Sequence, residues 1–346
     1  MTVSTVMKLL EQYLTALNPL WGARPCGVIE QINPLTSHAA SITIRPGRGW
    51  AGHRAGQFVT LGVDVDGVRH QRCYSITSPE GDPSGRIEIA VAAVPGGVVS
   101  NHLVHEARPG ELVRLDGPDG DFTIPVPRPG PLLLISAGSG ITPLVGMLRS
   151  LALGGHRADV VLIHHAPDEA STMFRSELER LAERHPWLRV EIVLTRAGGG
   201  HLDADRLANL CPDWGTREAF VCGPDSLLDF AMEHWAASTV EERLHLERFT
   251  PPRALRSGAD REGNATVRFG ASAIAAASDG QHTLLELAET AGVAAPSGCR
   301  MGICHTCTTR LDNGCVRDLR DGRVIEAGSH VQLCVSVAEG DVTLDI

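Results

Sequence analysis

Four cysteines near the C-terminal end constrain this chain more than any other feature. Cys299, Cys304 and Cys307 lie in the stretch SGCRMGICHTC, and Cys334 lies in the later stretch VQLCVS. This C-x4-C-x2-C…C spacing is the one by which four thiolates hold a [2Fe–2S] cluster. A tight loop supplies three ligands and a distant strand supplies the fourth. We therefore predict an iron–sulfur cluster bound by these four cysteines.

A zinc site and a disulfide pair are the alternatives for the cysteine cluster. Structural zinc sites favour paired C-x2–4-C knuckles, and only Cys304 and Cys307 form one. Cys315 competes with Cys334 for the fourth position, but it follows a predicted Asn313-Gly314 turn soon after Cys307. Cys334 is therefore the predicted ligand.

Composition narrows the class of protein. The chain has 346 residues, too many for one hydrophobic core, and length alone predicts two to three domains. A net charge of −10 argues against a general nucleic-acid binder, which needs a basic surface. No apolar run reaches the length of about 20 residues that a membrane span needs. The N-terminus lacks the residue order of a secretory signal, so we expect a cytoplasmic protein.

The pattern of the chain changes along its length. Residues 1–24 are predicted to form an N-terminal helical segment, because apolar side chains recur at helical spacing over Val6–Leu17. Residues 25–126 contain short β-like runs separated by turn residues, which is typical of an antiparallel barrel or sandwich. The predicted strands are Val28–Ile32, Ser41–Arg45, Gln57–Val63, Cys73–Thr77, Arg86–Val94 and Glu111–Leu115.

Strands and helices alternate over residues 127–249, which predicts a doubly wound α/β domain. The predicted strands there are Leu132–Ser136, Val160–His164, Val190–Thr195 and Ala219–Cys222, and the predicted helices are Pro143–Leu153, Ser171–His185 and Asp225–Trp235. Residues 250–264 have the composition of an interdomain linker. Residues 265–346 are predicted to form a small α+β domain, with strands at Ala265–Phe269 and Val331–Val337 and a helix at Thr283–Ala291.

Two short motifs in the barrel section suit a flavin. In the first, Arg72 can bind phosphate, Tyr74 can lie against a ring, and Ser75 can bond a ring nitrogen. In the second, which spans residues 95–100, Gly97 frees the backbone amides and Ser100 adds a hydroxyl at the start of a short helix. Such a helix start is a natural place for a pyrophosphate.

Two further motifs lie in the α/β section. Gly138, Gly140 and Thr142 follow a buried strand and open a helix, so that a ligand phosphate can approach the backbone. Cys222 and Gly223 end another strand, at the edge where doubly wound sheets bind ligands. Cys222 also fits a plain structural role, as a buried thiol at a strand end.

These motifs are RxYS at Arg72–Ser75, GGxxS at Gly96–Ser100, GSGITP at Gly138–Pro143 and CGP at Cys222–Pro224. In this order they resemble the ferredoxin–NADP⁺ reductase superfamily. The last section resembles a plant-type ferredoxin, apart from His305 where such ferredoxins usually carry glycine. Together they resemble class I oxygenase-type reductases with a C-terminal cluster domain. Asn18–Trp21 and the loop CRMGICHTC look most like reductases that serve fatty-acyl desaturases.

The resemblance implies an antiparallel β-barrel flavin domain, a doubly wound α/β nicotinamide domain and a β-grasp [2Fe–2S] domain. It also implies roles for the matching positions. Arg72, Tyr74, Ser75, Gly97 and Ser100 would bind the flavin, Gly138, Gly140, Thr142 and Gly223 the nicotinamide dinucleotide, and Phe249 would lie close to the flavin. Ser75, near the flavin N5, and Cys222, near the nicotinamide, are the predicted catalytic residues. FAD is expected rather than FMN.

Such a chain would pass electrons from NAD(P)H through FAD and the cluster to an external redox protein, because flavin alone of the three centres accepts hydride and releases single electrons. The expected acceptor is a membrane fatty-acyl desaturase, for which the N-terminal helix is the candidate for peripheral contact with the membrane surface. A Rieske-type or P450 oxygenase is the alternative acceptor. An iron–sulfur redox sensor is an alternative of another class. The choice of nucleotide stays open, because Asp168 favours NADH whereas Arg175 and Arg196 suit the phosphate of NADPH.

Overall fold

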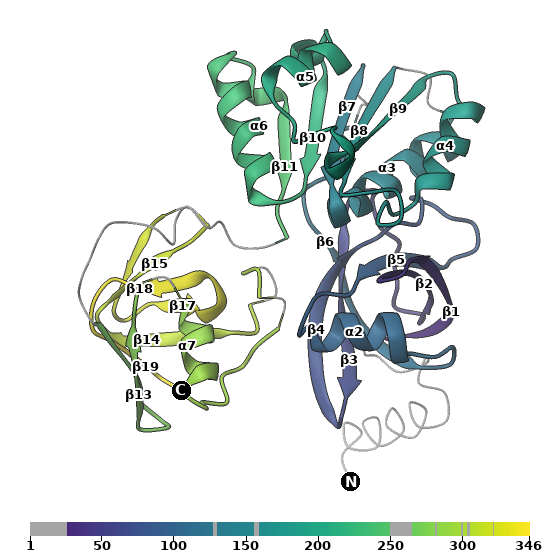
Figure 1. Ribbon diagram of the computed structural model, residues 1–346. Helices are drawn as coiled ribbons and strands as arrows, with labels where there is room; N and C mark the ends of the chain where they lie inside the picture. Colours follow the sequence, from purple (N-terminus) through teal and green to yellow (C-terminus); the bar gives the residue numbers. More distant parts are fainter. Residues whose placement is uncertain are drawn as a thin grey trace. The chain divides into compact units, whose positions relative to one another are not determined.

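The computed structural model describes residues 26–126, 130–155, 159–249, 265–280, 282–298, 300–302, 305–320 and 322–346. The chain divides into two compact units, with the division between Glu247 and Arg248. The first unit contains a six-stranded antiparallel sheet followed by a five-stranded parallel sheet, and the second contains a five-stranded and a three-stranded sheet (Figure 1).

The antiparallel sheet of the first unit has the strand order β4-β3-β6-β1-β2-β5. Its two outer strands meet through a bridge between Ile76 and Ile89, which closes the sheet into a barrel. Fully buried aliphatic side chains such as Ile29, Leu61 and Ile89 fill the interior. The strands are β1 (Cys26–Thr36), β2 (Ala39–Pro46), β3 (Phe58–Val65), β4 (Val68–Ser75), β5 (Ile87–Ala92) and β6 (Leu112–Asp119). Each predicted strand of this section overlaps one of them.

The parallel sheet has the order β11-β10-β7-β8-β9, with helices on both faces (Figure 1). From β7 the sheet extends to one side through β8 and β9 and to the other side through β10 and β11. The topological switch point therefore lies between β7 and β10, where doubly wound folds bind ligands. The strands are β7 (Leu132–Ala137), β8 (Val160–Ala166), β9 (Leu188–Leu194), β10 (Glu218–Cys222) and β11 (Leu244–Glu247), and the helices are α3 (Ile141–Leu153), α4 (Arg175–Arg184), α5 (Ala204–Leu210) and α6 (Asp225–Ala237). Of these, α5 and β11 have no counterpart among the predicted elements.

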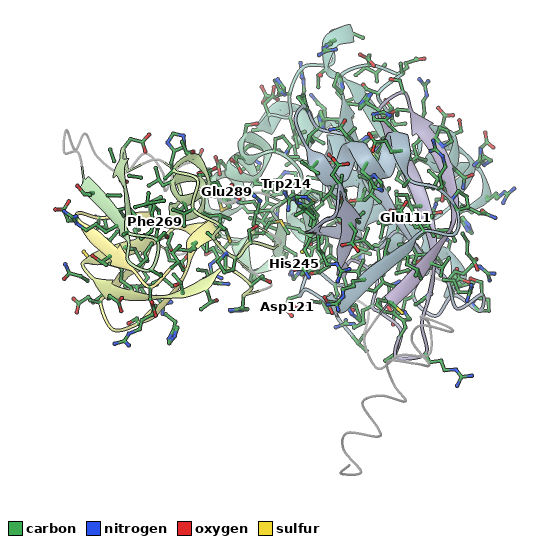
Figure 2. The ribbon with its side chains drawn as sticks, turned by 90° about the horizontal axis from the view of Figure 1, so that it is seen from below. Glu111, Asp121, Trp214, His245, Phe269 and Glu289 are labelled. Atoms are coloured by element: carbon green, nitrogen blue, oxygen red, sulfur yellow. The ribbon has the colours of Figure 1, made fainter. Side chains whose placement is uncertain are left out.

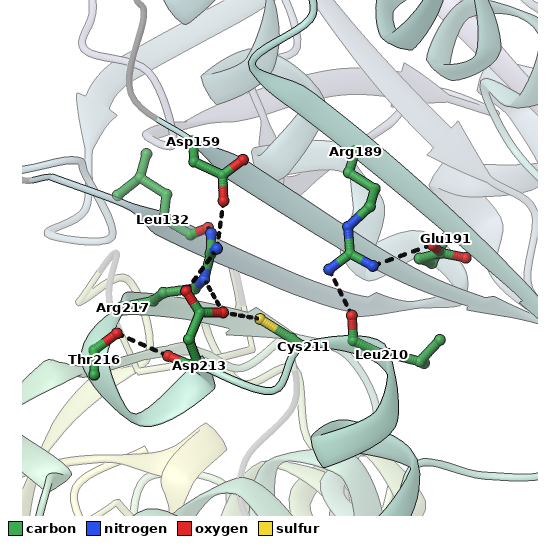
Figure 3. Close-up of polar contacts among 9 residues, drawn as sticks. All are labelled: Leu132, Asp159, Arg189, Glu191, Leu210, Cys211, Asp213, Thr216 and Arg217. Carbon is green, nitrogen blue, oxygen red and sulfur yellow. Dashed lines mark hydrogen bonds and ion pairs between the residues drawn. The ribbon is translucent and has the colours of Figure 1, made fainter.

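A buried arginine forms ion pairs and a hydrogen bond at the amino-terminal end of this sheet (Figure 3). Arg217 precedes β10, and only 5% of its surface is exposed. Its guanidinium pairs with Asp213 and Asp159 and donates a hydrogen bond to the carbonyl of Leu132, 3.2 Å away. These contacts all lie within the α/β domain.

The second unit has a five-stranded sheet in the order β13-β12-β19-β14-β17 and a three-stranded sheet in the order β16-β15-β18. Together with α7 they form the predicted β-grasp domain, whose core includes the fully buried Phe269 (Figure 2). Thr283 and Glu286 form a capping box at the start of α7. The elements are β12 (Ala265–Phe269), β13 (Ile274–Ser278), α7 (Leu284–Thr290), β14 (Thr308–Asn313), β15 (Cys315–Asp318), β16 (Val324–Glu326), β17 (His330–Gln332), β18 (Ser336–Ala338) and β19 (Val342–Leu344).

Two predictions of secondary structure need comment. The predicted continuous strand Val331–Val337 is wrong, because a 3₁₀ turn at Leu333–Val335 separates β17 from β18 and carries Cys334. The predicted helix Val6–Leu17 lies outside the described residues. Within the described residues, every helix is too short or too polar to cross a bilayer.

Candidate functional site

The first predicted flavin motif lies at the end of β4. Arg72, Tyr74 and Ser75 are the closing residues of this strand, which pairs with β3 along its whole length. Burial raises the pKa of the Tyr74 phenol well above its usual range, so it stays protonated. The Ser75 hydroxyl is buried and has no hydrogen-bond partner among the described residues. A buried hydroxyl left in this state is costly, and a flavin ring nitrogen or carbonyl would supply the missing partner.

The second flavin motif lies at the start of α2 (Val98–Asn101), which packs against β3 and β4. Gly97 caps this short helix, and a Cβ there would come within 2.5 Å of the Ser100 Oγ. A larger residue at this position would require the Ser100 and Val94 side chains to move. Ser100 is 9% exposed and accepts a hydrogen bond from the Val94 amide at 3.3 Å. The fold thus brings the two predicted flavin motifs onto neighbouring elements.

The predicted nicotinamide turn connects β7 to α3. Gly138 has φ +56°, a left-handed value that glycine adopts at little cost. A Cβ on Gly140 would lie 2.1 Å from the carbonyl oxygen of Cys222, so this turn packs directly on the end of β10. Thr142 is buried and donates a hydrogen bond to the Ser139 carbonyl at 3.0 Å. The two predicted nicotinamide motifs, on separate strands, therefore form one site.

A row of polar side chains crosses the carboxyl end of the parallel sheet. Strand register pairs Glu247 with Cys222, Cys222 with Ser136, and Ser136 with His164. Paired residues of neighbouring parallel strands point to the same face, so the four side chains form one line. Ser136 Oγ and His164 Nδ1 share a hydrogen bond of 2.9 Å. At the two ends of this line, Glu247 Oε2 and His164 Nε2 are buried and have no hydrogen-bond partner in the part of the chain that the structure describes.

This row carries no formal charge at neutral pH. Burial lowers the pKa of His164 to about 4 and raises that of Glu247 to about 8. Burial, and then the nearby Glu247 carboxyl, raises the pKa of the Cys222 thiol well above its usual range. Cys222 is fully buried and cannot act as a thiolate nucleophile. An uncharged, water-poor strip of this kind suits the uncharged ring of a reduced nicotinamide.

Glu247 was missing from the predicted site. The sequence signal was the segment Glu247-Arg248-Phe249 at the end of the α/β section, from which only Phe249 was chosen. The structure places Glu247 beside Cys222. Phe249 is half-buried and belongs to the second unit, so its closeness to the flavin stays a prediction.

Charged residues follow the carboxyl ends of β8 and β9. Arg196 pairs with Asp168 at 3.3 Å and leaves 76% of its side chain exposed. Hydrogen bonds from Ser171, and then the Arg196 charge, lower the pKa of the Asp168 carboxyl. Arg175 instead pairs with Glu169 at 2.8 Å and with Glu179 at 2.9 Å. Arg196 is therefore the more available of the two cations proposed for a nucleotide phosphate.

Two predicted cluster ligands face each other in the second unit. The sulfur atoms of Cys307 and Cys334 lie 3.3 Å apart, and both residues are buried. This separation is too long for a disulfide of about 2.05 Å. It suits thiolates that share one metal ion at about 2.3 Å each. Cys299 and Cys304 lie outside the described residues. Among the residues that the structure describes, no group of three metal-ligating side chains converges.

Among the described residues of the cluster loop, three have a left-handed backbone. Arg300 has φ +63°, Gly302 has φ +77° and His305 has φ +55°. Glycine adopts a value such as that of His305 at lower cost than other residues. The carbonyl of Gly302 accepts hydrogen bonds from Arg320 at 2.9 Å and Gln332 at 2.8 Å. These contacts hold the loop at Gly302 against the segments that carry Arg320 and Gln332.

Three family models match successive parts of the chain. They are an oxidoreductase FAD-binding domain over residues 46–124, an oxidoreductase NAD-binding domain over 134–233 and a 2Fe-2S iron-sulfur cluster binding domain over 269–339. An NADPH oxidoreductase of Mycobacterium tuberculosis is 42% identical, covering 99% of this chain and 90% of the relative. The reductase subunit of a glycine betaine monooxygenase of Pseudomonas aeruginosa is 30% identical, covering 84% of this chain and 87% of the relative.

Solved structures agree with this assignment of domains. Phthalate dioxygenase reductase has the same fold with a TM-score of 0.62 and 23% identity, over 93% of this chain and 97% of its own. An Amycolatopsis cytochrome P450 reductase matches with a TM-score of 0.58 and 28% identity, over 66% of this chain and 70% of its own. The FAD-binding barrel, the NAD-binding domain and the C-terminal cluster domain are thus established, and the chain belongs to the ferredoxin–NADP⁺ reductase family of oxidoreductases that carry FAD and a C-terminal [2Fe–2S] domain.

Proposed function

We propose that this chain is the reductase component of an oxygenase system, passing electrons from NADPH to a partner oxygenase. The observation that carries the proposal is the joining of the Gly138–Thr142 turn to the end of β10, next to the barrel that holds the unpartnered Ser75 hydroxyl. When bound, FAD supplies the step from hydride transfer to single-electron transfer. The residues of this chain bind FAD and the nicotinamide dinucleotide, orient them, and exclude water from the site.

We assign the roles of the residues as follows. Arg72, Gly97 and Ser100 hold the phosphates of FAD, Tyr74 covers its ring, and Ser75 donates a hydrogen bond near the reacting nitrogen. Gly138, Gly140, Thr142 and Gly223 hold the nicotinamide dinucleotide. Cys222 packs against the nicotinamide, and protonated Glu247 keeps that place free of charge. Cys299, Cys304, Cys307 and Cys334 bind the cluster.

The names of the relatives support an oxygenase better than the desaturase that the sequence motifs favoured. Similar chains are the reductase subunits of a stachydrine N-demethylase of Rhizobium meliloti, at 31% identity, and of a glycine betaine monooxygenase, at 30% identity. The test is reconstitution of the purified reductase with candidate oxygenase and desaturase components. NADPH-dependent product formation with the desaturase alone would overturn the oxygenase proposal.

We further propose that NADPH is preferred over NADH. Of the two cations proposed for a nucleotide phosphate, Arg196 has 76% of its side chain exposed and Arg175 has 35%, and the 42% identical relative is named for NADPH. Replacing Arg196 with leucine should raise the KM for NADPH about tenfold or more and leave that for NADH nearly unchanged, because only NADPH carries the extra phosphate. An equal effect on both nucleotides would contradict this preference.

The cysteine assignment has a matched pair of variants. Cys334→Ser should abolish the visible spectrum of the cluster and the reduction of cytochrome c, while NAD(P)H still reduces the flavin. Cys315→Ser removes a cysteine from the same unit and should leave both properties unchanged. Loss of the cluster in Cys315→Ser, with Cys334→Ser unaffected, would show that the wrong fourth ligand was chosen.

A further inference from the structure

Arg149 joins the barrel to the α/β domain inside the first unit. It lies on α3, the helix whose first turn follows the nicotinamide glycines. Its guanidinium donates hydrogen bonds to both carboxylate oxygens of Glu177, on α4, at 2.6 and 2.8 Å. It also donates to the Thr77 carbonyl at 2.9 Å and to Glu88, on β5, at 2.6 Å. One side chain thus holds two groups of the barrel and one of the α/β domain.

The barrel side of this contact is continuous with the flavin motif. Thr77 is only two residues beyond Ser75, and its own hydroxyl donates a hydrogen bond to Glu88 at 2.8 Å. One turn earlier on α3, Gly146 packs so closely that a Cβ there would lie 2.5 Å from the Ile76 carbonyl oxygen. Ser150, which follows Arg149 on α3, accepts a hydrogen bond from the Glu80 amide at 2.8 Å. The segment from 76 to 80 is therefore held along the middle of α3.

We propose that Arg149 is a positioning residue for hydride transfer, which fixes α3, and with it the nicotinamide turn, against the strand end that carries Ser75. The inference rests on the proposed roles of Ser75 and of the Gly138–Thr142 turn. Arg149 touches neither cofactor site and acts through α3 and the 76–78 segment. Its side chain is 19% exposed, and the pair with Glu88 is similarly shielded from water, so the contact resists salt better than a surface ion pair.

The chain offers a close control for this arginine. Arg217 also binds two carboxylates and one backbone carbonyl, but all of these lie within the α/β domain. Replacing either arginine with methionine removes a comparable set of bonds and should lower the midpoint of thermal unfolding. Only Arg149→Met removes the connection to the barrel.

The experiment compares the two variants, loaded with flavin, in anaerobic stopped flow with saturating NADPH. A displacement of about 1 Å between reacting groups can cost about 100-fold in rate. We expect the limiting rate of flavin reduction to fall about 10- to 100-fold in Arg149→Met and less than twofold in Arg217→Met. The long-wavelength charge-transfer absorbance between flavin and nicotinamide should weaken only in Arg149→Met. Amide hydrogen exchange over residues 76–78 should accelerate in Arg149→Met and stay unchanged in Arg217→Met.

An unchanged limiting rate in Arg149→Met, or equal losses of rate in both variants, would overturn the proposal and leave Arg149 a purely stabilising residue. If Arg149→Met does not fold, Glu88→Ala removes one of the two barrel partners of Arg149, leaves the bond to the Thr77 carbonyl, and should lower the rate severalfold. An unchanged rate in that variant also overturns the proposal. The wild-type protein distinguishes failure of the Arg149 proposal from failure of the proposed reductase function. If the chain is a reductase, NADPH bleaches the flavin of the wild type whatever the role of Arg149.

Discussion

The buried carboxyl of Glu247 makes the stability of the first unit depend on pH. Burial raises its pKa from 4.5 to about 8. Between these values the folded state holds a proton that the unfolded state releases, so the free energy of unfolding falls as the pH rises. Each pKa unit corresponds to about 1.4 kcal/mol. From about pH 5.5 to pH 8 the loss is therefore at most about 3 kcal/mol.

Glu247→Gln keeps the shape of the side chain and carries no proton to lose. The variant should therefore gain stability relative to the wild type as the pH rises. For a unit of this size, about 3 kcal/mol corresponds to a relative shift of roughly 6–12 °C in the midpoint of thermal unfolding. The assay follows the release of flavin fluorescence on heating at several pH values.

The exposed Glu242 provides the control, since Glu242→Gln changes the same atoms on a side chain that is 67% exposed. This surface substitution should change the midpoint of thermal unfolding little, because such changes are usually worth less than about 0.5 kcal/mol. If the difference between Glu247→Gln and the wild type is constant from about pH 5.5 to pH 8, the Glu247 carboxyl is ionised in the folded protein. The description of the polar row as uncharged would then be wrong.

Three further outcomes follow from the geometry. Gly140→Ala should raise the KM for NADPH at least about tenfold in steady-state kinetics and leave the flavin content full, because its Cβ would meet the Cys222 carbonyl at 2.1 Å. An unchanged KM would show that the contact between this turn and the end of β10 does not shape the NADPH site. Ser75→Ala should slow flavin reduction by roughly 100-fold in stopped flow with an unchanged unfolding midpoint, since its hydroxyl has no protein partner; a stability loss without a rate loss would refute its role. Gly302→Ala should lower the iron content of the purified protein, because its Cβ would lie 2.9 Å from Val335 at φ +77°; full iron loading would show that the loop adapts.

The sequence predicted the elements with strong local patterns. The continuous apolar run Leu132–Ser136 predicted a strand buried on both faces, and the structure confirms it as the central strand β7. The four-residue strand β11 escaped because Leu244–Glu247 is too short to show a period and lies at the sheet edge. The strand Val331–Val337 was wrong because its composition is typical of a strand, whereas Cys334 lies on a tight turn.

The candidate site was predictable where one motif carries its own chemistry, as with the glycine turn. It was not predictable where the chemistry depends on pairing between distant strands. Glu247, Cys222 and Ser136 are far apart in the sequence and become neighbours only through the register of β11, β10 and β7. Arg149 escaped for the same reason, because its partners Thr77, Glu88 and Glu177 come from three separate segments.

The left-handed backbone at His305 bears on how such a loop tolerates change. The side chain at this position is exposed, although it stands only two residues before the ligand Cys307. Glycine, asparagine and aspartate adopt this conformation readily, whereas valine and isoleucine do so at a high cost. Variation at position 305 is therefore limited by backbone shape rather than by interior volume. The surface chemistry just outside the metal centre can diverge among homologues while the ligand frame stays intact.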